Sequence, residues 1–180
     1  VKHAFLDGGK FLERIENVKR SDITAESEIL RYCIDESVRF KSHIVSQDER
    51  EGGLRAILNL GHTTGHAIES LTKYNRYSHG EAVSMGIMTA LLLSQRILNF
   101  SDKNIARAIR IMKALQLPLN IQEKAKEILS HMDHDKKKDG KDLKFVLLED
   151  FGKPKYGVTV SRDIILETLK FQKGWEELGR

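Results

Sequence analysis

The chain has 180 residues, of which 40% are hydrophobic and 31% charged, a composition typical of a globular domain with one sizeable core. Its formal net charge is +4, but acidic residues are interleaved with the basic ones along the expected helices, so we do not expect a nucleic-acid partner. The sequence shows neither a secretory signal pattern nor an apolar run of the roughly 18 to 20 residues that span a bilayer, which favours a cytoplasmic protein without a membrane partner. The single cysteine, Cys33, excludes a disulfide within the chain.

Apolar residues recur at helical spacing through most of the chain. The first such pattern begins at Val1 and is broken by Gly8 and Gly9. Ser21 and Thr24 are candidate caps for a later helix, because acidic residues that suit a first helical turn follow them. The patterns predict helices over residues 11–18, 29–45, 56–71, 81–100, 105–115, 122–131 and 163–178.

Two features set the predicted fold class. The run from Glu81 to Phe100 is apolar on most sides, which is typical of a helix buried in the middle of a bundle. The short runs 144–148 and 156–160 flank a segment that contains Gly152 and Pro154, and this order predicts a hairpin. We therefore expect a mainly α fold, a multi-helix bundle with one small β-hairpin near the C-terminus, as a single domain over residues 1–180.

Three histidines stand at spacings that metal chemistry can use. His62 and His66 are four residues apart, which places them one turn apart on one helix face, and His79 follows after a polar turn. Histidine pairs on a helix are more often ordinary surface or core residues, but a catalytic zinc commonly takes three protein ligands. Gly61 and Gly65 favour a metal site, because glycine inside a helix indicates a close approach of a partner helix or ligand.

The residues around these histidines resemble the C-terminal domain of 3-dehydroquinate synthases. Segments around Lys2, Lys41 and Lys136 also match, so the resemblance spans nearly the whole chain. The central motif reads Arg55-x-x-x-Asn59-x-Gly61-His62-x-x-Gly65-His66-Ala67-x-Glu69, followed by His79-Gly80-Glu81-Ala82-Val83 and Gly86.

The resemblance implies an enzyme of the shikimate pathway, a lyase of aromatic amino acid biosynthesis. Such an enzyme converts a phosphorylated seven-carbon keto-sugar acid to 3-dehydroquinate and phosphate, with NAD and a divalent metal, Zn²⁺ or Co²⁺. No G-x-G-x-x-G motif follows a predicted strand in these residues, so we expect the NAD-binding domain to lie N-terminal to them. The resemblance also implies a homodimer when full length, and inactivity of this domain alone.

Roles for individual residues follow from the same resemblance. His62 and His79 are expected to ligate the metal, with a third ligand from a glutamate three residues before Lys2, upstream of Val1. His66, Lys2 and Arg55 are the expected catalytic residues, with His66 moving protons. The expected contacts to the substrate's carboxylate, phosphate and hydroxyls are Lys2, Lys41, Glu51, Arg55, Asn59, His66 and Lys136, or Lys137 if the register of the lysine run shifts by one.

Three other functions compete with this one. Related sugar phosphate cyclases share the scaffold and the metal histidines but act on other substrates. Metal-dependent alcohol and glycerol dehydrogenases resemble the domain in outline, yet they give no reason for the lysine-rich contacts. A helical interaction domain without chemistry predicts that Lys41, Arg55 and Lys136 point to unrelated surfaces. Without the resemblance, residues 134–141 are interpreted as a solvated loop, and neither His131 nor His134 is expected to bind metal.

Overall fold

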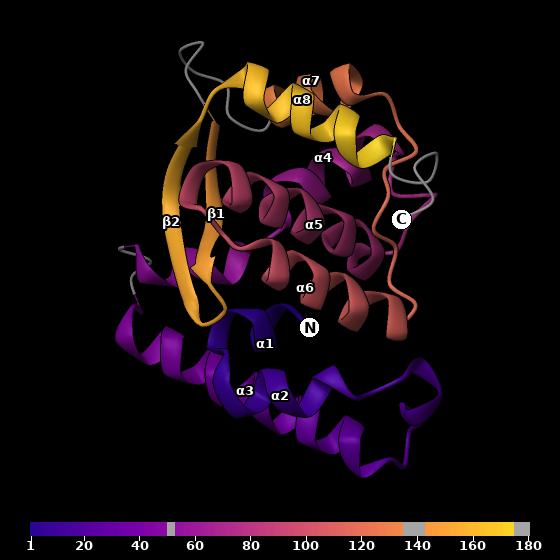
Figure 1. Cartoon of the computed structure of the whole chain (residues 1–180), viewed down its shortest axis with the longest axis vertical. Coiled ribbons are helices and arrows are strands. Elements are labelled where there is room, and N and C mark those ends of the chain that lie inside the picture. Colours follow the sequence, from indigo (N-terminus) through magenta and orange to yellow (C-terminus); the bar gives the residue numbers. More distant parts are fainter. Residues whose placement is uncertain (50–52, 135–142, 175–180) are drawn as a thin grey trace.

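The computed structural model describes residues 1–49, 53–134 and 143–174 of the chain. Within these residues the structure is a helical bundle with a two-stranded antiparallel hairpin, which confirms the predicted fold class (Figure 1). The central helix, α5, has α4, α7 and α8 above it in this view, and α6 below it. The helices α1, α2 and α3 form the lower end of the molecule. The helices are α1 (Lys2–Asp7), α2 (Gly9–Glu16), α3 (Glu28–Gln47), α4 (His62–Leu71), α5 (His79–Leu98), α6 (Asp102–Ala114), α7 (Ala125–His134) and α8 (Arg162–Lys173).

Helix α5 forms the centre of the core. Every residue from Ala82 to Ser94 is buried, as the apolar run predicts. Contrary to the expectation that no apolar run is long enough to span a bilayer, the length and hydropathy of α5 would suit a membrane span within the described residues, but 72% of that window is buried inside the molecule. A soluble core helix has the same properties, so we interpret α5 as the bundle centre.

A capping box sets the first residue of α5. The Ser78 hydroxyl oxygen accepts a hydrogen bond from the backbone N–H of Glu81, and the Glu81 carboxylate accepts one from the backbone N–H of Ser78. These reciprocal bonds satisfy backbone donors that the helix end leaves unpaired. The helix therefore begins at His79, two residues earlier than apolarity alone indicates, and His79 lies in its first turn.

The predicted helix over residues 56–71 is wrong as one continuous element. The structure has a 3₁₀ helix, η2 (Leu54–Asn59), and then α4, with a break at Gly61. Gly61 has a φ of 81°, and a Cβ there would lie 2.7 Å from the backbone nitrogen of Ile87. Both facts require glycine at this position. The chain consequently turns just before His62, and His62 becomes the first residue of α4.

Helices α4 and α5 pack with their backbones in close approach. A Cβ on Gly65 would lie 3.2 Å from the backbone of Val83, and one on Gly86 would overlap the carbonyl oxygen of Gly61. Small residues at such a crossing let two helices approach more closely than larger side chains allow. This contact brings the start of α4 beside the start of α5.

The hairpin consists of β1 (Leu143–Asp150) and β2 (Lys153–Val160), both longer than expected, joined by Phe151 and Gly152. Its buried strand β1 lies on α5, where the backbone N–H of Leu148 donates to the Ser94 hydroxyl at 2.9 Å. At the hairpin turn the Gly152 N–H donates to the carbonyl of Phe5 at 3.0 Å. The turn thus holds α1 in place.

Some predicted boundaries differ from the structure. Helix α3 is capped by Ser27, whose hydroxyl oxygen accepts a hydrogen bond from the Leu30 N–H. The predicted caps, Ser21 and Thr24, instead lie in or beside the short 3₁₀ helix η1 (Arg20–Asp22). Helix α7 runs from Ala125 to His134, about three residues later than predicted. Helix α8 ends at Lys173 with Gly174 as its C-cap, short of the predicted end near residue 178, and the residues after Gly174 lie outside the described residues.

Candidate metal and substrate site

The three histidines singled out by spacing meet at the crossing of α4 and α5. The ring centroid of His62 lies 5.3 Å from that of His66 and 5.4 Å from that of His79, and the latter two are 6.0 Å apart. All three line one cavity of about 690 Å³. They come from the first two turns of α4 and the first turn of α5, so the glycine contact described above sets their separation.

His62 is held in a form suited to metal binding. Its Nδ1 lies 3.2 Å from the carbonyl oxygen of Leu60, which suits an Nδ1–H donor and leaves Nε2 available. Burial, reinforced by the nearby charge of Lys2, lowers the pKa of His62 to about 4. The ring is therefore neutral at neutral pH, and the neutral imidazole is the form that ligates metals.

His79 contacts a buried carboxylate. Its Nδ1 lies 3.0 Å from Oε1 of Glu69, whose side chain is 7% exposed, whereas the His79 side chain is 60% exposed. His66, Glu69 and His79 each offer one ligand atom, and these atoms all lie within 4.8 Å of one another. Imidazole and carboxylate groups this close together are a donor set that fits zinc.

A second cavity of about 440 Å³ adjoins the histidine cavity and is lined by cations. Asn59 and His62 line both cavities, so the two cavities lie next to each other. Four of the predicted substrate contacts lie here, whereas Glu51, Lys136 and Lys137 lie outside the described residues. The lining residues are Lys2, His3, Lys41, Arg55, Ala56, Leu58, Asn59 and His62.

Local hydrogen bonds and burial shape the cationic cavity. The Asp48 carboxylate accepts from the backbone N–H groups of Gly53 and Arg55, both at 2.9 Å, and so fixes the start of η2. Burial, together with the charge of Lys41, lowers the pKa of Lys2 to about 8. Lys2 is therefore still mostly charged at neutral pH and can bind an anion.

Acidification is expected to destabilise the folded chain between about pH 6.5 and pH 4. Both His3 and His62 have a pKa lowered from 6.5 to about 4, and burial is the main cause in each case. In this window the unfolded chain binds more protons than the folded chain, so the free energy of unfolding falls as pH falls. Urea denaturation measured across the window tests this, with His3→Asn expected to lose less stability than the wild type. An equal loss in His3→Asn, or a reduced loss in the exposed control His43→Asn, would contradict the assignment.

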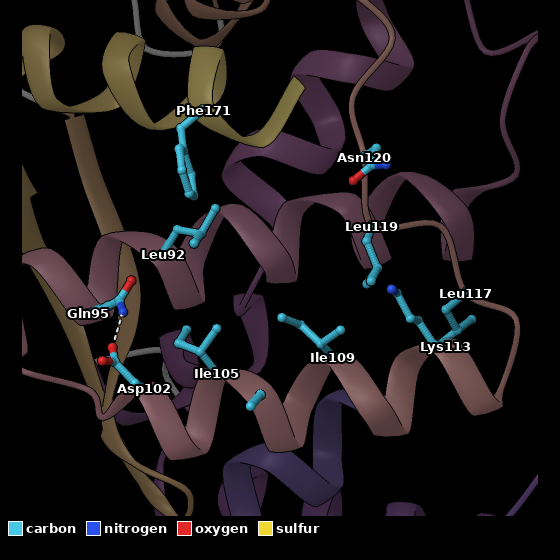
Figure 2. A pocket seen from close by; sticks show the side chains of 11 residues that line it. Leu92, Gln95, Asp102, Ile105, Ile109, Lys113, Leu117, Leu119, Asn120 and Phe171 are labelled. Atoms are coloured by element: carbon cyan, nitrogen blue, oxygen red, sulfur yellow. Dashed lines mark hydrogen bonds between the residues drawn. The ribbon is translucent and has the colours of Figure 1, made fainter. Parts of the chain in front are cut away.

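A separate apolar cavity of about 600 Å³ lies between α5, α6 and the end of α8 (Figure 2). Its lining includes Leu92, Ile105, Ile109 and Phe171, with Lys113 as its cation among the described residues. Among residues 1–49, 53–134 and 143–174, no histidine and no predicted site residue lines it. The described residues with a predicted role lie instead at the histidine and cation cavities.

Comparison with known protein families gives one match over most of the chain. The sequence profile described as 3-dehydroquinate synthase C-terminal matches residues 1–138. The chain belongs to this family. The resemblance inferred from the histidine motif is thereby confirmed.

Curated 3-dehydroquinate synthases match over nearly the whole chain. The enzyme of Leptospira interrogans serogroup Icterohaemorrhagiae serovar copenhageni is 45% identical over 174 residues, which are 97% of this chain and 48% of that protein. The enzyme of Acinetobacter baumannii strain SDF is 37% identical over 94% of this chain and 46% of that protein. The chain therefore spans about half the length of these 3-dehydroquinate synthases.

Solved sugar phosphate cyclases share the fold of this 3-dehydroquinate synthase C-terminal domain. One is a 2-epi-5-epi-valiolone synthase from Streptomyces hygroscopicus subsp. jinggangensis 5008 with NAD⁺ and Zn²⁺ bound, at TM-score 0.81 and 18% identity, covering 95% of this chain and 48% of that one. Another is a 2-deoxy-scyllo-inosose synthase complexed with carbaglucose-6-phosphate, NAD⁺ and Co²⁺, at TM-score 0.73 and 21% identity. The match covers 96% of this chain and 53% of that one. At these identities the likeness concerns the fold.

One carboxylate and two histidines that line the site were not predicted to have a role. Glu69 could have been found by helical geometry, because it lies seven residues after His62 and three after His66, near the same face of α4. His3 follows Lys2 and lines the cationic cavity. His131 was not expected near the site, yet it lines the histidine cavity, with Nδ1 3.1 Å from the Ser70 hydroxyl. No sequence signal links α7 to α4, so only the tertiary packing shows this contact.

Proposed function

We propose that this chain is the metal- and substrate-binding half of a cytoplasmic 3-dehydroquinate synthase. The reaction converts 3-deoxy-D-arabino-heptulosonate 7-phosphate to 3-dehydroquinate and phosphate, with NAD bound mainly by an N-terminal domain. The observation that carries the proposal is a pair of adjoining cavities that share Asn59 and His62, one lined by the three histidines and the other by Lys2, Lys41 and Arg55. A helical interaction domain without chemistry gives no reason for this convergence.

The metal is proposed to bind His62 and His79, with an upstream glutamate as third ligand. The ring distance of 5.4 Å is compatible with one metal between His62 and His79, although the ring of His66 is equally near His62, and the neutral state of His62 suits a ligand. Bound zinc or cobalt would supply a Lewis acid for the oxidation of a substrate hydroxyl to a ketone and for the later reduction of that ketone. His66, on the same face of α4 one turn from His62, lies where it can exchange protons with a substrate in the same cavity.

The cationic cavity is proposed to bind the two anionic groups of the substrate. Lys2 and Lys41 provide ammonium donors, and Arg55 provides a planar fork that suits a phosphate or carboxylate. Asn59 lies between the cavities, where an amide can bind a hydroxyl. Glu51 and Lys136, or Lys137, complete the proposed set from outside the described residues.

Another sugar phosphate cyclase activity is the second candidate, because both solved structures compared above are cyclases with other names. Substrate turnover separates the two. A protein that joins this chain to its N-terminal domain is expected to release phosphate from 3-deoxy-D-arabino-heptulosonate 7-phosphate in the presence of NAD and zinc. Preference for sedoheptulose 7-phosphate would support the second candidate and overturn the first.

The 180-residue chain alone is expected to show no turnover when NAD is added. The oxidation step needs a hydride acceptor held beside the substrate, and the proposal assigns that binding to the other domain. Phosphate release and nicotinamide absorbance measure this result. Zinc titration should also show tighter binding to a form extended upstream of Val1, since the extension supplies the third ligand. Turnover by the chain alone, or equal zinc affinities, would contradict the proposed division of the site.

A further inference from the structure

We propose that Glu69 is a positioning residue that orients His79 toward the metal, an inference that rests on the proposed function. The Glu69 carboxylate accepts a hydrogen bond from Nδ1–H of His79 at 3.0 Å. This assigns the proton of His79 to Nδ1 and leaves the lone pair of Nε2 as the metal ligand. In metal sites a second group commonly fixes the tautomer and orientation of a histidine ligand in this way.

The contrast in burial shows which partner positions the other. The Glu69 side chain is 7% exposed, on the second turn of a helix packed against α5, whereas the His79 side chain is 60% exposed. Packing therefore fixes the carboxylate but leaves the imidazole free to turn. A neutral imidazole exists in two tautomers, of which one places the lone pair on Nδ1. The hydrogen bond to Glu69 selects the other tautomer and sets the orientation of the ring.

The burial of Glu69 also argues for a function. A buried carboxylate loses hydration, and this loss is costly unless a donor compensates for it. Within the described residues the Nδ1–H of His79 supplies that donor, ten residues away across the turn between α4 and α5. A glutamine or an apolar residue would fill the same space at lower cost. The charged partner becomes useful when His79 binds a cation, because the carboxylate increases the basicity of the ring.

A direct bond from Glu69 to the metal is the competing arrangement, since its oxygen belongs to a group of possible ligand atoms within 4.8 Å of one another. The two arrangements require different tautomers. If Glu69 positions the ring, Nδ1 keeps its proton and Nε2 binds the metal. If Glu69 and Nδ1 both bind the metal, Nδ1 carries no proton.

Nitrogen-15 NMR of the histidines tests the tautomer in the wild-type chain. We expect the Nδ1–H form for His79 without metal, and the same proton on Nδ1 after zinc is added. A proton on Nε2 in the metal-free chain, or zinc bound at Nδ1, would overturn the proposal. The metal-free spectrum addresses Glu69 even if the chain binds no zinc, so a failure of the proposed function remains distinguishable.

Zinc affinity of variants provides the second test. Glu69→Ala is expected to bind zinc about 10- to 100-fold more weakly than the wild type, as is typical when an outer-shell partner of a metal ligand is lost. Glu69→Gln, whose amide oxygen still accepts from Nδ1–H, should recover part of this loss. Unchanged affinity in Glu69→Ala would overturn the proposal. A loss in Glu69→Gln as large as in His79→Ala would indicate direct ligation and would also overturn it.

Thr64→Val is the matched control. Thr64 is on the same helix and 1% exposed, and its hydroxyl oxygen has no hydrogen-bond partner among the described residues. The substitution therefore changes a buried polar group of α4 without touching His79. Zinc affinity and the His79 spectrum should match the wild type, and a loss equal to that of Glu69→Ala would assign the effect to helix packing and overturn the proposal.

Discussion

The His79→Ala variant is expected to bind zinc more than about 100-fold more weakly than the wild-type chain, a larger loss than that of an outer-shell partner. His79 is one of the two proposed ligands within this chain, and its ring lies 5.4 Å from that of His62. Removing it leaves one histidine and water in a site that normally has three protein ligands. Competition with a chromophoric chelator measures the affinity, and His62→Ala should show a similar loss.

Two further variants make this result specific. His43→Ala removes an exposed histidine of α3 that hydrogen bonds Gln47, outside both cavities, and should leave zinc affinity unchanged. His66→Ala should weaken zinc binding less than His79→Ala, because His66 is assigned to proton transfer. A large loss in His66→Ala with no loss in His62→Ala would show that His66, Glu69 and His79 form the metal site, and would reject the proposed pair.

Gly86→Ala is expected to lower the free energy of unfolding by about 3 kcal/mol or more, the upper range for overpacking a core. A Cβ at this position would overlap the carbonyl oxygen of Gly61 and would lie 2.9 Å from the backbone nitrogen of Gly65. Both atoms belong to backbone, which cannot move aside as a flexible side chain can. The two helices must separate, and the histidines on them must separate as well.

Thermal and urea denaturation measure this effect, with Gly80→Ala as the matched control. Gly80 is on the same helix, but a Cβ there meets nothing within 4 Å. Alanine is the better helix former, so Gly80→Ala should have an unfolding free energy within about 1 kcal/mol of the wild type, or above it. Wild-type stability in Gly86→Ala would contradict the close approach of α4 and α5.

Much of the fold could be predicted from the sequence because helical periodicity is a local property. The apolar run after His79 indicated the buried central helix, and the turn residues at Gly152 and Pro154 indicated the hairpin. The break at Gly61 could not be predicted in this way. Periodicity counts residues along the chain, and it does not show that Ile87 and Val83 lie against the backbone there.

Only the part of the site that depends on local spacing or on the family motif could be predicted from the sequence. The spacing of His62, His66 and His79 is a local property of the sequence, and the family resemblance added the expected roles of these residues and the cations around Lys2. The hydrogen bond between Glu69 and His79 depends on how α4 and α5 cross, and the approach of His131 depends on how α7 packs. Such contacts join residues that no sequence pattern relates.

The attachment of α1 to the hairpin turn has a consequence for the order of folding. The histidine cavity is built largely from residues 59–79, so most of its contacts close short loops. Lys2 belongs to a helix that packs on α2 and α3 and is also held by a hydrogen bond from Gly152 to Phe5, which closes a far longer loop. Contacts between distant residues form late, and during synthesis they must wait for the ribosome to reach the hairpin. We therefore expect a nascent chain to form its histidine cavity well before Lys2 settles into the cationic cavity.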